Sequence, residues 1–256
     1  MKKSWVGRSS EAIAHVLIWG FCAFPVWRDL DVRIEGLEHV PSRGPVVIAA
    51  RHYHNFYDGA ILLTRLRYPV HLLVALDWTR TPLQRRLLET MCYVARWPGV
   101  LRADAWNIGR GQYDGRSAYQ LSEASACLRR ALATAVDVLR SGDILVVFPE
   151  AYPNIDPDAT PKTAPDEFLP FELGFAKIAQ MAERDGHARV AILPAGFTYA
   201  PKQPGQRRQQ VTLRLGEPIT LADYPDRQRL AATIEQQVKK LSLTPAACQR
   251  GRRPDG

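Results

Sequence analysis

The sequence lacks the cysteine and histidine spacings that build zinc sites or disulfide frameworks. Its four cysteines lie far apart in the chain and include no CxxC pair; they are Cys22, Cys92, Cys127 and Cys248. Metal sites and disulfide scaffolds both need defined Cys or Cys/His spacings. The spacings therefore predict neither a zinc site nor a disulfide framework, and they favour reduced thiols facing the cytosol. We expect no metal and no bound cofactor.

Nucleic-acid-binding signatures are missing as well. The chain has no helix-turn-helix pattern, zinc-finger spacing or RNP-like aromatic strand, and its aromatic residues do not interleave with a basic run. The formal net charge of +8 nevertheless favours an anionic partner. With nucleic acid disfavoured, an anionic bilayer surface and a phosphate-bearing substrate remain.

The hydrophobic run near the N-terminus is too short to cross a membrane comfortably. Residues 12–27 carry no Lys, Arg, Asp or Glu, but a spanning helix wants roughly 20 apolar residues, and His15 and Pro25 interrupt this one. No small-residue cleavage site follows it. Its tryptophans and basic flanks suit the headgroup region. We expect residues 1–30 to be an interfacial helix on the cytoplasmic face of the cell membrane, peripheral or monotopic; a helix packed on the protein's own core and a true span are the alternatives.

The remainder shows no repeat, low-complexity tract or shift in composition. A chain of 256 residues suits one sizeable core. We therefore expect residues 31–244 to form a single domain. Residues 245–256 are polar, which predicts a flexible tail.

Strands alternate with helices along this domain. Continuous apolar runs bounded by turn residues predict buried strands at 46–50, 71–76, 144–148 and 190–194, whereas alternation predicts strands at 31–37 and, as an edge strand, at 211–215. Apolar residues at helical spacing predict helices at 122–139, 171–182 and 228–241. This order predicts an α/β sandwich of a mostly parallel or mixed sheet flanked by helices.

Three polar groups are placed where strands of such a sheet end. His52, His54 and Asp58 follow the first buried strand, and they could supply a general base and the carboxylate that orients it, or could simply cap the next helix. Glu150 follows another buried strand. It could bind the hydroxyl group of a substrate that accepts a transferred group, or it could be a surface residue. Arg96 and Arg102 suit phosphate recognition, although arginines that merely snorkel at a surface are commoner.

Five segments, taken in order, resemble the glycerolipid acyltransferase family, which contains 1-acylglycerol-3-phosphate acyltransferase. They are GLEHVPSRGPVVIAARH, SGDILVVFPEAYP, FELGFAKIA, VAILPAG and LRLGEPI, and the similarity runs from about residue 32 to residue 241. The resemblance implies transfer of a fatty acyl group from acyl-CoA or acyl carrier protein to a hydroxyl of a lysophospholipid-type acceptor, most of all 1-acylglycerol-3-phosphate. The partners expected are therefore a membrane surface, a lipid acceptor and a thioester donor.

The resemblance also implies residue roles. It makes His52 the general base and Asp58 its orienting partner, with five residues between them instead of the family's four and with His54 as the alternative base. Arg102 is implied as the phosphate ligand, assisted by Arg51, which stands where the family has Asn.

The block that contains Glu150 departs further from the family. Its Gly, Thr and Arg are replaced by Ala151, Tyr152 and Pro153, so a basic residue is missing from the acceptor pocket.

Three alternatives stay open. The acceptor could be a lipid or glycolipid alcohol without phosphate, or the protein could be a noncatalytic lipid-binding protein on the same fold. Residues 54–59 also match the His-x3-Asp-Gly pattern of a different acyltransferase class.

Overall fold

The structure is a computed structural model that describes residues 5–42, 44–66, 68–102, 117–156, 160–164, 166–224 and 226–243. The tail predicted for residues 245–256 and Cys248 lie outside these ranges. The helices within them are α1 (Trp5–Asp29), α2 (Tyr57–Arg65), α3 (Pro82–Ala95), α4 (Ala124–Arg140), α5 (Gly174–Glu183) and α6 (Arg227–Ser242). The strands are β1 (Leu30–Glu35), β2 (Val46–Ala50), β3 (Val70–Leu72), β4 (Val74–Ala75), β5 (Gly99–Val100), β6 (Ile144–Val147), β7 (Ala191–Tyr199) and β8 (Gln209–Leu215).

Six strands form one curled sheet in the order β1-β8-β7-β2-β6-β3. All neighbours run parallel except β7 and β8, which are antiparallel. Every residue of β2 and β6 is buried, as their apolar sequences predict for central strands covered on both faces. The predicted α/β sandwich with a mostly parallel sheet is confirmed.

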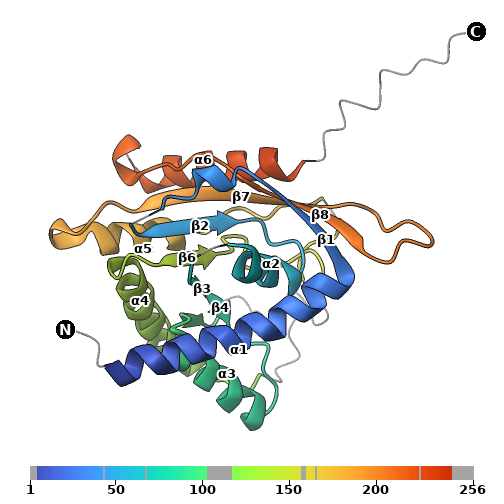
Figure 1. Cartoon of the computed structure of the whole chain (residues 1–256). Coiled ribbons are helices and arrows are strands. Elements are labelled where there is room, and N and C mark those ends of the chain that lie inside the picture. Colours follow the sequence, from blue (N-terminus) through green and yellow to red (C-terminus); the bar gives the residue numbers. More distant parts are fainter. Residues whose placement is uncertain are drawn as a thin grey trace, which may run out of the picture.

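Helices cover both faces of the sheet (Figure 1). One apolar core joins α1, α2 and α3 to the sheet, and a second joins α4, α5 and α6 to its other face. Figure 1 shows α6 on one side of β7 and β2, with α1 and α3 on the other. The predicted helices at 122–139, 171–182 and 228–241 correspond to α4, α5 and α6, with ends shifted by up to three residues.

Two sequence expectations about strands were wrong. The run 71–76 divides into β3 and β4, because Leu73 N–H still donates to Val146 of the main sheet, whereas Val74 N–H donates to Pro98 beside β5. β8 is not an edge strand but lies between β1 and β7. Its alternation reflects burial of one face, with Val211, Leu213 and Leu215 inward, and not a position at the edge.

Two helices show clear local start signals. Thr81 and Gln84 form a capping box at the start of α3, with Pro82 in its first turn. Asp226 accepts a hydrogen bond from Arg229 N–H and caps α6. α3 was not predicted from the sequence, although Thr81, Pro82 and Gln84 carry the pattern of a helix start.

α1 is a single helix that lies against the domain. Cys22 and Val26 are buried against the core, and Tyr57 of α2 donates a 2.7 Å hydrogen bond to Asp29 at the helix end. Among the side chains described from residue 13 onward, most of the other large apolar ones of α1 are more than half exposed: Ile13, Val16, Leu17, Trp19, Phe21, Phe24 and Trp27. No helix within the described ranges is long and apolar enough to cross a membrane.

Candidate active site

A histidine and a carboxylate meet where β2 ends. Parallel strands deliver their carboxyl ends to the same edge of a sheet, and loops at that edge carry functional side chains in α/β folds. His52 lies two residues beyond β2, and Asp58 is the second residue of α2. The distance from His52 Nδ1 to Asp58 Oδ2 is 3.3 Å. The Asp58 side chain is fully buried and that of His52 is 14% exposed, so Nε2 is the ring nitrogen left to face a substrate.

Asp58 is held on both of its oxygens. Its Oδ2 accepts the backbone N–H groups of Tyr53 at 2.6 Å and His54 at 2.8 Å, while Oδ1 accepts the Tyr199 hydroxyl at 2.6 Å. Burial, with the adjacent Asp58 charge, raises the pKa of Tyr199 well above its usual range, so the phenol stays a donor. Tyr199 was not among the residues predicted from the sequence; it ends β7 at the same edge of the sheet.

His54 faces the start of α2. Its Nδ1 accepts the N–H groups of Phe56 at 3.3 Å and Tyr57 at 3.4 Å, and these are among the groups that a helix start leaves unpaired. Burial lowers the pKa of His54, which favours the neutral ring that this acceptor role needs. Its imidazole makes no hydrogen bond to the Asp58 carboxylate among the described contacts, so the two histidines occupy different environments.

Glu150 is brought to the same place from β6. Its side chain is fully buried. Oε1 accepts His52 N–H at 3.0 Å, and Oε2 accepts Lys162 Nζ at 2.6 Å and Leu169 N–H at 3.1 Å. The carboxylate is thus fully engaged with the protein. Lys162 was not among the sequence candidates, because nothing local to residue 162 indicates a buried partner twelve residues earlier.

Arg51, which directly precedes His52 in the chain, is buried. Its guanidinium lies between the rings of Tyr53, at 4.9 Å, and Phe168, at 4.3 Å, and donates to the Phe197 carbonyl at 3.4 Å. Burial lowers the pKa of Arg51, and the charges of Glu150 and Asp58 oppose that effect. Only 5% of the surface of Arg51 is exposed, so its guanidinium is packed within the protein.

The two remaining arginines lie at opposite ends of β6. Arg102 approaches the Glu150 block: its Nε and Nη2 both donate to Asp77 Oδ2, at 2.9 Å and 2.6 Å, and its Nη1 donates to the Ala151 carbonyl at 3.3 Å. Arg96 instead pairs at 3.2 Å with Asp143, which precedes β6. The structure therefore brings Arg102 to the site and does not bring Arg96 there.

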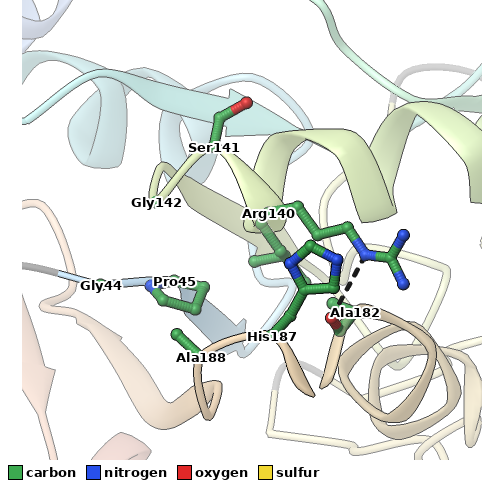
Figure 2. Close-up of a pocket in the computed structure, with 9 residues that line it drawn as sticks. Gly44, Pro45, Arg140, Ser141, Gly142, Ala182, His187 and Ala188 are labelled. Atoms are coloured by element: carbon green, nitrogen blue, oxygen red, sulfur yellow. Dashed lines mark hydrogen bonds between the residues drawn. The ribbon is translucent and has the colours of Figure 1, made fainter. Parts of the chain in front are cut away.

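A pocket of about 190 Å³ lies elsewhere (Figure 2). It is lined by residues that precede the strands, including Pro45 before β2, Gly142 before β6 and Ala188 before β7. Arg140 Nε donates a hydrogen bond to the Ala182 carbonyl at 3.3 Å, which Figure 2 marks with a dashed line. This pocket is at the amino ends of the strands, away from His52. Within the described ranges, no three His, Cys, Asp or Glu side chains are grouped as metal ligands.

A His–Asp pair at the carboxyl edge of a helix-covered sheet is an arrangement that can take up and return a proton during group transfer. The acyltransferase family model matches residues 31–198, and the chain belongs to this family. The resemblance to glycerolipid acyltransferases is thereby confirmed. No curated protein matches the chain significantly.

One similar solved structure is the 1-acyl-sn-glycerophosphate (LPA) acyltransferase PlsC from Thermotoga maritima. The match has a TM-score of 0.56 and 20% sequence identity, and it covers 96% of this chain and 83% of that one. At this identity the likeness concerns the fold.

Proposed function

We propose that this acyltransferase moves a fatty acyl group from acyl-CoA or acyl carrier protein to a hydroxyl of a lysophospholipid-type acceptor, 1-acylglycerol-3-phosphate above all. His52 Nε2 takes the proton from the acceptor hydroxyl while its oxygen attacks the thioester carbonyl. The tetrahedral intermediate then releases the thiolate of the donor, and the imidazolium gives its proton to that thiolate. Asp58 keeps Nδ1 protonated and stabilises the imidazolium as it forms.

The observation that carries this proposal is the buried Asp58 beside His52 Nδ1 at the end of β2. It favours His52 over His54, whose Nδ1 faces backbone N–H groups of α2. The His52 ring also stacks on Phe148 at 4.3 Å between centroids, which fixes its plane.

A second acceptor class has an observation in its favour. Arg102 is already paired with the fully buried Asp77, so the two charges cancel locally. A lipid alcohol without phosphate would suit such a site. However, a guanidinium has five N–H donors, and contacts with the described residues use three of them, so two can still donate to a phosphate.

We propose a membrane surface on the cytoplasmic side as the place of action. α3 packs beside α1 and adds exposed Leu83, Leu87 and Tyr93 to the exposed apolar side chains of α1. Such a surface favours an interface with lipid. Phe21 of α1 contacts Phe56 of the His52 loop, with ring centroids 6.2 Å apart, so this surface adjoins the site. Without α1 the protein should leave the vesicle pellet in sedimentation; unchanged pelleting would contradict the assignment.

The test of the reaction compares His52→Ala with His54→Ala, using acyl-CoA as donor and either lysophosphatidic acid or a monoacylglycerol as acceptor. His52→Ala should lower kcat by about 10²-fold or more with the fold intact. His54→Ala is the matched control and should act mainly on stability. A silent His52→Ala with a damaging His54→Ala would reassign the base. Turnover with the monoacylglycerol alone would select the second acceptor class, and no turnover at all would favour a lipid-binding protein.

A further inference from the structure

Lys162 is a buried lysine whose ammonium group is fully used. Only 6% of its surface is exposed, and Nζ donates to Glu150 Oε2 at 2.6 Å, to the His52 carbonyl at 3.0 Å and to Asn154 Oδ1 at 3.1 Å. An ammonium has three N–H donors, and these three acceptors account for all of them. Lys162 is therefore not available to a substrate, and its contacts explain what it does.

Glu150 and Lys162 together bind both backbone polar groups of His52, the proposed base. His52 N–H donates to Glu150 Oε1 at 3.0 Å, and the His52 carbonyl accepts from Lys162. Glu150 and Lys162 are themselves an ion pair with both side chains fully buried. The backbone at His52 is thus clamped between the two members of one charge pair, and the clamp decides where the imidazole can point.

The clamp also accounts for the altered Glu150 block. A buried carboxylate without a cation is strongly destabilising. Pro153 stands where the resemblance to the family places an arginine, and Lys162 supplies the positive charge from twelve residues beyond Glu150. The charge faces inward to Glu150 and His52, so it serves the base and not the acceptor.

We propose that Lys162 is a positioning residue for acyl transfer, which fixes the His52 peptide so that Nδ1 faces Asp58 and Nε2 faces the acceptor hydroxyl. This inference rests on the proposed function, since it acts through His52 as the base. Misplacement of a catalytic group by about 1 Å can cost on the order of 10²-fold in rate. The loss should therefore appear in kcat, with KM for donor and acceptor unchanged.

The test uses Lys162→Met together with Glu150→Gln, because Lys162→Met alone would leave a buried, unpaired carboxylate and endanger folding. In the double variant the amide oxygen introduced at position 150 can still accept His52 N–H, but the His52 carbonyl loses its donor. We expect kcat to fall by about 10-fold to 10²-fold with little change in KM. Lys177→Met, on the exposed face of α5, is the matched control for loss of a lysine.

The decisive comparison repeats the double variant in a His52→Ala background. Residues that act as a unit are non-additive, so a positioning role predicts almost no further loss there. An equal loss in both backgrounds, or a change confined to KM, would overturn the role of Lys162 and leave the proposed function standing. A His52→Ala enzyme as active as wild type would overturn the proposed function itself.

Lys162→Arg is the second variant, for the case in which the double variant does not fold. It keeps the charge opposite Glu150, but its planar guanidinium does not reproduce the three-acceptor geometry of the ammonium. We expect a folded protein with a smaller loss in kcat. The proposal would be contradicted if Lys162→Arg had the kcat of the wild type while the double variant either was unfolded or was also as active as the wild type.

Discussion

Two histidine–aspartate pairs lie at opposite ends of the sheet, and they differ in which partner is buried. At the carboxyl end, Asp58 is fully buried and the His52 side chain is 14% exposed. At the amino end, His71 is fully buried and Asp143 is 27% exposed, with His71 Nε2 3.7 Å from Asp143 Oδ2. A base must present one free nitrogen to its substrate, and only the first arrangement leaves the ring accessible.

The second nitrogen of each histidine reinforces the contrast. His71 Nδ1 lies 2.9 Å from the Ala95 carbonyl, so both of its nitrogens face the protein interior. The carboxylates differ too: Asp143 pairs with the cation of Arg96, whereas Asp58 accepts from the neutral Tyr199 hydroxyl. A neutral donor orients Asp58 without cancelling the negative charge that an imidazolium needs. Similar residue types thus leave an accessible imidazole at one end of the sheet, as the proposed base requires, and a fully buried imidazole at the other.

The largest effect that tests this contrast is expected from the carboxylates. Asp58→Asn should lower kcat by on the order of 10³-fold or more, because an amide no longer fixes the tautomer or stabilises the imidazolium. Asp143→Asn should leave kcat/KM within about twofold and act on thermal stability instead. Comparable losses of activity in the two variants would remove the distinction between the pairs.

The two arginine–aspartate pairs give the next effect. Arg102→Gln with Asp77→Asn, and Arg96→Gln with Asp143→Asn, each remove a charge pair without leaving a buried charge unpaired. If Arg102 binds the acceptor phosphate, the first variant should raise KM for lysophosphatidic acid by about 10-fold while KM for acyl-CoA stays constant. The second should change neither. Equal KM values for lysophosphatidic acid in all three proteins would exclude Arg102 as a phosphate ligand.

Tyr199→Phe probes the neutral donor to Asp58. Loss of one hydrogen bond to a carboxylate should lower kcat by about 3-fold to 10-fold. Asp58 keeps the backbone N–H groups of Tyr53 and His54 as donors in this variant. An unchanged kcat with a lower thermal stability would indicate a packing role only.

The smallest effect concerns the backbone. Ala151, beside Glu150, has φ 63°, and Arg96, at the amino end, has φ 55°, a left-handed conformation that favours glycine. Ala151→Gly should raise the free energy of unfolding by about 1 kcal/mol, measured by denaturant titration, with activity unchanged. Arg96→Gly should show no such gain, because it also breaks the contact with Asp143. A destabilised Ala151→Gly would contradict the assigned backbone conformation.

The sequence by itself determined those strands, helices and candidate residues that follow from the local order of apolar and polar side chains. Continuous apolar runs identified β2 and β6 as central strands, helical spacing identified α4 and α6, and the position after a strand brought His52 and Asp58 forward as candidates. These features follow from side-chain periodicity within a few residues, because burial on one or two faces is written directly into the order of apolar residues. The place of β8 in the sheet was mispredicted for a related reason: alternation reports a half-covered face, not the number of neighbouring strands.

Only the tertiary structure decided the partners of the charged and polar groups. Asp58 meets a tyrosine 141 residues away, Arg102 meets an aspartate 25 residues earlier, and Glu150 meets Lys162 across a loop. No local rule selects such partners, since they depend on which loops the sheet order brings to one edge. The same folding of the chain separated Arg96 from the site and brought Lys162 Nζ to the His52 carbonyl. The residue types in the sequence indicated which side chains could act in catalysis or binding. The tertiary fold determined which of these side chains lie together at one site.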